Sequence, residues 1–172
     1  ALTVGATQGF LYLRGEYEFI APHLREVLGQ RRALGLLGAN VAGSGQAFDI
    51  ALHLGAGAYV CGEETALIES VEGKRGIPRT RPPFPVDRGY LGLPTVNNNE
   101  ETFVQVAQIA VHGGEWFAAH GTEKSRGTRI LSVSGDVTRP GLYEIPWGVT
   151  VAEVLQDAGA HDVQAVLVGG PS

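Results

Sequence analysis

The stretch Gly55-Ala56-Gly57-Ala58-Tyr59-Val60-Cys61-Gly62-Glu63-Glu64 decides the fold, because it joins an alternating apolar segment to a helix with paired carboxylates in its first turn. Glycine permits positive φ and close approach of the backbone to a ligand. A helix start offers free N–H groups to an anion. Taken alone, such a stretch is more often only a tight turn, and acidic residues are common at helix starts. The segments that follow it decide between a turn and a binding loop.

Three further segments follow the glycine-rich stretch in a distinctive order. They are Glu72-Gly73-Lys74-Arg75-Gly76-Ile77-Pro78-Arg79, then Arg81-Pro82-Pro83-Phe84-Pro85, then Gly92-Leu93-Pro94-Thr95-Val96-Asn97-Asn98-Asn99-Glu100-Glu101-Thr102. The whole series resembles the flavin-bearing, NADH-oxidising subunit of respiratory complex I. It is equally similar to the relatives of that subunit in NAD-reducing hydrogenases and NAD-dependent formate dehydrogenases. The resemblance covers nearly the whole chain and keeps the order of the motifs.

The composition is that of a folded, acidic protein. Hydrophobic residues make up 44% of the 172 residues and charged residues 18%, which is enough apolar material for a core. This length fits one domain, or a larger piece plus a small one. A net charge of −5 argues against a nucleic-acid partner. Lys74, Arg75, Arg79 and Arg81 nevertheless cluster on one loop, which suits either solvent or a small anionic ligand such as a dinucleotide.

Cys61 is the only cysteine, so the chain cannot form an internal disulfide, an iron–sulfur cluster or a structural zinc site by itself. Its neighbours favour a small packed residue over a reactive thiol. The sequence shows no signal peptide and no apolar run of about 18 residues, so we expect a cytoplasmic location without membrane insertion. Because it begins at Ala1 and lacks methionine, we interpret it as a fragment of a longer polypeptide.

The first two thirds of the chain predict an α/β layer. Strands are expected at 9–14 and 48–54, and helices at 22–34, 63–72 and 98–112. In such layers ligands bind beyond the carboxyl ends of the strands, which is where the glycine-rich stretch stands. The proline-rich segment 73–94 predicts a functional loop without regular structure.

The predicted helix over 98–112 is amphipathic. Its apolar residues recur at helical spacing and predict a stripe that faces a core, which the two aromatic residues after the helix continue. These positions are Phe103, Val106, Ala107, Ala110, Val111, Trp116 and Phe117.

The last third predicts a small separate domain. Strands are expected at 129–135, 142–145 and 165–168, with a helix at 151–158, and this ββαβ order suggests a β-grasp unit. Ser132-Val133-Ser134-Gly135-Asp136-Val137, Pro140-Gly141 and Gly169-Gly170 resemble the soluble-ligand-binding β-grasp domain that follows the flavin domain in the complex I family. The expected fold class is therefore α/β. A partial Rossmann-like flavin-binding α/β domain spans residues 1–124, and a small β-grasp (ubiquitin-like) α+β domain spans residues 125–172.

The resemblance implies that FMN and NAD are the cofactors, and it assigns the glycine-rich stretch to them. Gly57 belongs to this site, Tyr59 and Gly62 line the flavin, and Glu63 and Glu64 hydrogen-bond flavin or nucleotide groups. The chemistry is sensible, since adjacent carboxylates accept hydrogen bonds from ribose hydroxyls or a carboxamide.

The same resemblance assigns residues of the two later segments. Phe84 stacks on the NADH adenine, although the alternative is a rigid proline-flanked loop that packs on itself. Arg81 approaches the nucleotide phosphates as a bidentate donor, where a lysine is frequent in the family. Asn98, Asn99 and Thr102 lie near the FMN ring edge and phosphate, and they also stand where a helix N-cap belongs.

The resemblance implies a subunit of an NADH dehydrogenase (diaphorase) that transfers hydride between NAD(H) and FMN. Its partners are NAD(H) and other subunits of a multisubunit redox complex. The family's opening Arg-Gly-Gly-Ala-Gly-Phe-type loop and its cluster-binding cysteines are missing here. The iron–sulfur clusters therefore belong to the parent subunit, no residue is assigned as catalytic or metal-binding, and we expect little or no NADH oxidation by this chain alone.

A different class of function competes with this one. The chain is alternatively a non-catalytic ligand- or partner-binding or assembly module that retains the fold. The joint presence of Glu63, Glu64, Phe84 and Asn99 favours the enzyme, because a binding module has no reason to keep all four.

Overall fold

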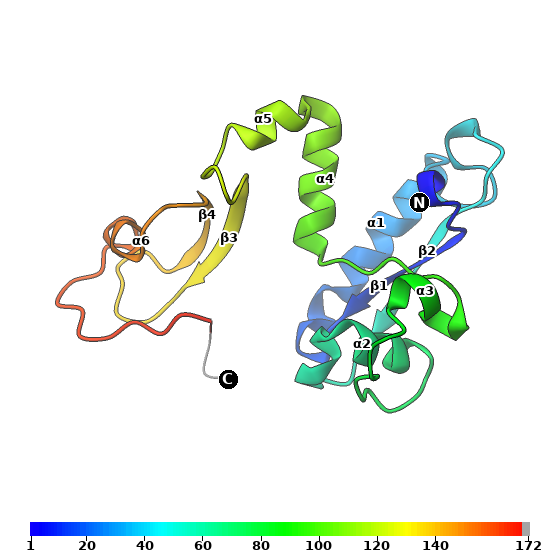
Figure 1. The fold of residues 1–172 in the computed structure, drawn as a ribbon, viewed down its shortest axis with the longest axis horizontal. Helices are drawn as coiled ribbons and strands as arrows, with labels where there is room; N and C mark the ends of the chain where they lie inside the picture. The colour runs from blue at the N-terminus through cyan, green and yellow to red at the C-terminus, as the bar shows by residue number, and fades with distance from the viewer. Residues whose placement is uncertain (170–172) are drawn as a thin grey trace. The chain divides into compact units, whose positions relative to one another are not determined.

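The structure is a computed structural model that describes residues 1–169 (Figure 1). The chain forms two compact units, a first unit over Ala1–Asn97 and a second unit from Asn98 onward. The first unit contains β1 (Gln8–Leu13), α1 (Ala21–Ala33), β2 (Asp49–Leu54), α2 (Glu64–Val71) and α3 (Pro85–Arg88). The second unit contains α4 (Glu100–His112), α5 (Gly114–Ala118), β3 (Thr128–Val133), β4 (Gly141–Pro146) and α6 (Val151–Ala158). Short 3-10 helices occur at Leu2–Val4, Gly15–Ile20, Val41–Gly43, Tyr59–Gly62 and Tyr90–Gly92.

The first unit is built on a parallel strand pair. Strands β1 and β2 align with Gln8 opposite Asp49 and Leu13 opposite Leu54. Parallel strands need a crossover connection, and α1 lies in that connection. Helix α1 has a proline in its first turn, as the sequence predicted. The glycine-rich stretch starts directly after β2, so the predicted α/β order is confirmed here.

The core of the first unit brings β1, α1 and α2 together. Its buried apolar residues are Leu13, Ala21, Leu28, Leu37, Val41, Cys61, Ala66 and Ile68. The Tyr12 hydroxyl lies 3.0 Å from the Ser70 Oγ and so links β1 to α2. A Cβ on Gly55, directly after β2, would lie 2.5 Å from that Tyr12 hydroxyl, so a larger residue would displace the Tyr12 side chain. The glycine that opens the decisive stretch therefore has a packing role.

The proline-rich segment contains regular structure, which corrects the prediction of an irregular loop. Helix α3 begins with a proline in its first turn, where the missing N–H costs no intrahelical hydrogen bond. The 3-10 helix Tyr90–Gly92 follows at once. The Thr95 hydroxyl accepts a hydrogen bond from the Tyr90 N–H at 2.8 Å. Local capping of this kind cannot be inferred from proline content.

The second unit contains an antiparallel hairpin and a capped helix. Strand β3 pairs with β4, with Thr128 opposite Pro146. Helix α6 starts with a capping box, in which Thr150 Oγ1 accepts the Glu153 N–H and the Glu153 carboxylate accepts the Thr150 N–H. The buried apolar residues of this unit are Ile145, Val154 and Ala158.

The predicted strand over 165–168 is wrong. This segment is irregular, and Val166, Leu167 and Val168 are exposed. Within the described residues it pairs with no strand, and an apolar run forms a strand only where a partner offers free backbone groups. The part of the second unit that follows α5 is therefore ββα within the described residues and lacks the last strand of the predicted ββαβ order.

The helix predicted over 98–112 is present as α4. Its apolar stripe, however, is not packed against a core as predicted. No residue of α4 is buried, and Phe103 and Val106 are 54% and 53% exposed. Trp116 is also exposed. Within the described residues of the second unit, no element covers the apolar stripe. Contacts join α4 to the hairpin of the second unit, since the Gln105 amide donates to the Thr128 carbonyl and the Glu101 carboxylate accepts the Ile130 N–H.

Among the described residues, no helix combines the length and the apolar character that crossing a bilayer requires.

Candidate functional site

The carboxylate of Glu63 caps helix α2, which starts one residue later than the sequence predicted. Its Oε2 accepts the backbone N–H groups of Thr65 and Ala66, each at 3.0 Å, and the Thr65 hydroxyl at 2.5 Å. Glu63 itself has an extended backbone with φ −82° and ψ 132°, as expected at an N-cap. This carboxylate therefore has a structural role in addition to any ligand that it binds.

These contacts favour the charged form of Glu63. Partial burial alone would raise the pKa of the carboxyl group, but the hydrogen bonds from the Thr65 hydroxyl and from two backbone N–H groups act in the opposite direction. The nearby Arg81 guanidinium adds to them, and the net result is a pKa below the ordinary value of glutamate. Glu63 is thus an ionised hydrogen-bond acceptor at neutral pH.

Four of the predicted site residues come together in the first unit. The guanidinium of Arg81 lies 2.8 Å from the Glu64 carboxylate and 3.9 Å from that of Glu63. It also lies 5.9 Å from the centre of the Phe84 ring. The Arg81 side chain is 43% exposed and that of Glu64 is 34% exposed. This acidic–cationic–aromatic cluster, defined as Glu63, Glu64, Arg81 and Phe84, is therefore accessible to a ligand.

The glycine-rich stretch leads directly into the acidic–cationic–aromatic cluster. Gly57 has φ of +80°, a conformation that side-chain-bearing residues rarely adopt. Tyr59 is 72% exposed and begins the 3-10 helix Tyr59–Gly62 that precedes α2. A Cβ on Gly62 would meet no other atom within 4 Å. Packing within the chain therefore does not require glycine at position 62, which leaves ligand approach as a reason for it.

The asparagines and the threonine that are predicted to contact FMN belong to the second unit. Asn98, Asn99 and Thr102 flank the start of α4 and are exposed. Asn99 occupies the N-cap position with an extended backbone, but its side chain makes no capping hydrogen bond. The capping alternative considered for this residue is thus not realised by its side chain.

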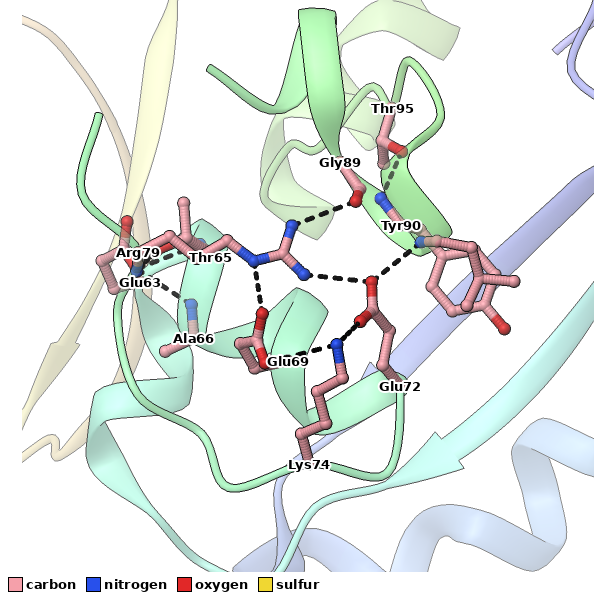
Figure 2. A network of polar contacts seen from close by, with 11 residues as sticks. Glu63, Thr65, Ala66, Glu69, Glu72, Lys74, Arg79, Gly89, Tyr90 and Thr95 are labelled. Carbon is pink, nitrogen blue, oxygen red and sulfur yellow. Dashed lines mark hydrogen bonds and ion pairs between the residues drawn. The ribbon is translucent and has the colours of Figure 1, made fainter. Parts of the chain in front are cut away.

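A second ionic cluster was missed by the sequence analysis. The guanidinium of Arg79 lies between Glu69 and Glu72 of the α2 end and the Gly89 carbonyl, as Figure 2 shows. Lys74 lies 2.6 Å from the second oxygen of Glu72. The Glu72 side chain is only 4% exposed. We call Glu69, Glu72, Lys74 and Arg79 the buried ionic network after its most buried member, Glu72, although the Lys74 side chain is 60% exposed.

The sequence analysis assigned the four cations of the loop to solvent or to a small anionic ligand, and the buried ionic network gives two of them partners within the chain. Lys74 and Arg79 are already paired with carboxylates of the chain. The hydrogen bond from Lys74, followed by those from the Leu91 N–H and Arg79, outweighs burial and lowers the pKa of Glu72 to about 2. The signal that could have predicted this pairing is the three-residue spacing of Glu69 and Glu72, which places both on one face of a helix.

The geometry fits a dinucleotide and a flavin better than a metal or a nucleophilic centre. Two adjacent carboxylates accept hydrogen bonds from sugar hydroxyls, one guanidinium matches a phosphate, and one exposed ring offers a stacking face. The glycine-rich turn lets a planar group approach the backbone closely. The residues present therefore fit the two groups that the sequence resemblance implies.

Comparison with known proteins identifies the family. A profile of the Nuo51 FMN-binding domain matches residues 1–108. The chain is 54% identical, over its whole length, to the alpha chain of the NAD-reducing hydrogenase HoxS of Cupriavidus necator. It is 48% identical, also over its whole length, to an NADH-quinone oxidoreductase subunit of Mycobacterium tuberculosis. It covers 29% and 40% of these two proteins, respectively, so it spans well under half of their length.

A solved structure agrees with these sequence relatives. The crystal structure of an NAD+-reducing NiFe-hydrogenase in the air-oxidized state superposes with a TM-score of 0.82 at 47% identity. The match covers 91% of this chain and 26% of that one. It confirms the predicted α/β class. Because the family profile matches well over half of the residues, this chain belongs to the Nuo51 FMN-binding domain family.

Proposed function

We propose that this chain supplies part of the FMN and NAD(H) site of an NADH dehydrogenase or diaphorase subunit. The observation that carries the proposal is the acidic–cationic–aromatic cluster directly after a glycine-rich strand-to-helix turn. When FMN is bound, it supplies the ring that exchanges hydride with the nicotinamide, and the protein supplies binding and orientation. The relatives named above, one from an NAD-reducing hydrogenase and one from an NADH-quinone oxidoreductase, support this assignment.

The paired carboxylates orient the ligands by accepting hydrogen bonds. Glu64, on the exposed side of the first turn of α2, faces ribose hydroxyl or carboxamide donors. Glu63 keeps one oxygen for the α2 cap and offers the other. Gly57, Tyr59 and Gly62 line the flavin along the preceding turn. This division leaves each carboxylate at least one oxygen for a ligand.

Arg81 and Phe84 hold the nucleotide from the other side. The exposed ion pair between Arg81 and Glu64 contributes only about 0–1 kcal/mol, so exchanging it for a phosphate costs little. Arginine binds a phosphate through two parallel N–H donors. The Phe84 ring is 49% exposed and offers a face to the adenine. Arg81 therefore passes from an internal partner to the ligand.

The proposal also includes three residues of the second unit. Asn98, Asn99 and Thr102 contact the FMN ring edge and phosphate from the start of α4. We divide the chain into an FMN- and NADH-binding domain over residues 1–124 and a soluble-ligand-binding β-grasp domain over residues 125–172. Electrons leave to iron–sulfur clusters outside this chain, and the partners are other subunits of complex I, a hydrogenase or a formate dehydrogenase.

An FMN titration of the parent subunit that contains this chain tests the site. We expect the double variant Glu64→Gln with Asn99→Ala to raise the FMN dissociation constant about 10- to 100-fold, because two polar contacts to the ligand are weakened. Quenching of flavin fluorescence on binding measures this constant. The control Glu123→Gln with Gln164→Ala removes the same charge and a similar amide at exposed positions. Unchanged FMN binding in the test variant contradicts the assignment.

A further inference from the structure

Thr65 is buried although it is polar. Its residue surface is 1% exposed, and no other polar or charged residue of the described chain is buried to the same degree. Its Oγ1 donates to the Glu63 Oε2 at 2.5 Å and accepts the backbone N–H of Arg79 at 2.8 Å. One hydroxyl thus joins the first turn of α2 to the loop that carries Arg81 and Phe84 (Figure 2).

Only a hydroxyl can make both contacts from one atom. An ionised carboxylate accepts hydrogen bonds and a backbone N–H donates them, so the group between them must donate and accept at once. Glu63 is held in the ionised form by its contacts, as described above. A side chain of the same shape without a hydroxyl leaves the Arg79 N–H without this partner in a partly buried place, which costs free energy.

The hydroxyl also fixes which oxygen of Glu63 faces outward. Oε2 is taken by Thr65 and the N–H groups of the α2 start, whereas Oε1 is the atom nearest Arg81, at 3.9 Å. On the loop side, the hydrogen bond from the Arg79 N–H to Thr65 holds the backbone two residues before Arg81. The Arg79 side chain is anchored separately by the buried ionic network. Glu63 and Arg81 are thus both positioned through Thr65.

We propose that the Thr65 hydroxyl is a positioning group for NAD(H) binding, which holds the free oxygen of Glu63 and the Arg81–Phe84 segment at their working separation. The inference rests on the proposed function and adds to it a residue that does not touch the ligand. It therefore predicts a defect in nucleotide affinity that depends on the hydroxyl and not on the shape of the side chain.

The test uses the parent subunit that contains this chain, loaded with FMN and supplied with an artificial electron acceptor. We expect Thr65→Val to raise the KM for NADH about tenfold while kcat changes much less, because ground-state contacts are displaced. Thr65→Ser, which keeps the hydroxyl, restores the KM of the wild type. In a background of Glu63→Gln, Thr65→Val adds little further, since both changes act on one contact. Thr65→Ala serves in the same way if the valine variant does not fold.

A control variant and a second measurement distinguish failure of the Thr65 inference from failure of the proposed function. Thr150→Val removes a capping hydroxyl from α6 and leaves the KM unchanged. Hydrogen exchange of the Arg79 amide is faster in Thr65→Val than in Thr65→Ser. Equal KM values for wild type, Thr65→Ser and Thr65→Val in an active enzyme overturn the inference. A wild-type protein that binds FMN but never oxidises NADH overturns the proposed function itself, and the exchange of the Arg79 amide then still reports whether the hydroxyl contact exists.

Discussion

Replacing Arg79 with methionine is expected to lower the free energy of unfolding of the first unit by about 2–4 kcal/mol. The substitution removes one of the two cations that Glu69 and Glu72 share and leaves them only Lys74, and it leaves the Gly89 carbonyl with only the Gly92 N–H as donor. This loss is smaller than that for a fully buried ion pair, because the Arg79 side chain is 27% exposed and water compensates in part for the missing contacts. Arg79→Lys keeps the charge but not the fork of donors, so we expect an intermediate loss.

The measurement has to report on the first unit alone. Both tryptophans, Trp116 and Trp147, lie in the second unit, so their fluorescence is an internal reference. Hydrogen exchange of the α2 amides under increasing urea reports on the first unit. Arg75→Met changes an exposed arginine of the same loop and serves as the matched control. If Arg79→Met and Arg75→Met show the same exchange at every urea concentration, the buried ionic network does not stabilise this unit.

The buried ionic network also predicts acid sensitivity that centres on Glu72. Its pKa of about 2 in the folded chain lies below the ordinary value of 4.5, so the unfolded chain binds the proton more tightly. The stabilisation is fully present above about pH 4.5 and is lost as the pH falls toward about 2. We expect its size to be about 1–3 kcal/mol, since the network lies near the surface and is partly screened.

A comparison of two variants isolates this effect. At neutral pH, Glu72→Gln is less stable than wild type, and the difference shrinks as the pH falls through the range in which wild-type Glu72 gains its proton. Glu18→Gln, at an exposed position of the same unit, keeps the pH profile of the wild type. Stability is again measured by exchange of the α2 amides, at a series of pH values from neutral down toward the pKa of Glu72. A difference between Glu72→Gln and wild type that stays constant over this range contradicts the assignment of the low pKa to Glu72.

Sequence patterns predicted the local part of this fold well. The strands β1 and β2, the helices α1, α2 and α4, and the hairpin with α6 follow from apolar spacing, proline and glycine positions, and capping residues. The failures involve partners distant in sequence. The run Ala165–Val168 lacks a described strand to pair with, and the stripe of Phe103 and Val106 lacks a described surface to cover it. Periodicity says which face is apolar but not what lies against it.

In the candidate site, too, the residues themselves were predicted but their partners distant in sequence were not. The family resemblance identified Glu63, Glu64, Arg81 and Phe84, and the structure brings these four together in the first unit. It did not reveal that Glu63 is also a helix cap or that Arg79 is already paired. Both facts depend on how the proline-rich segment folds back onto α2, and that depends on tertiary contacts such as the one between the Arg79 N–H and Thr65. The ligand-binding roles of these four site residues stay predictions, as do those of Asn98, Asn99 and Thr102.

Reduction of bound flavin by NADH tests the central claim most directly. The parent subunit that contains this chain, loaded with FMN, is mixed with NADH under anaerobic conditions while the visible absorbance of the oxidised flavin is followed. We predict rapid bleaching in the wild type, and a rate at low NADH concentration that falls at least about tenfold in Phe84→Ala with Arg81→Ala, because stacking and phosphate contacts are both lost. Flavin that stays oxidised in the wild type, or bleaches equally fast in the double variant, contradicts an NAD(H) site built on these residues.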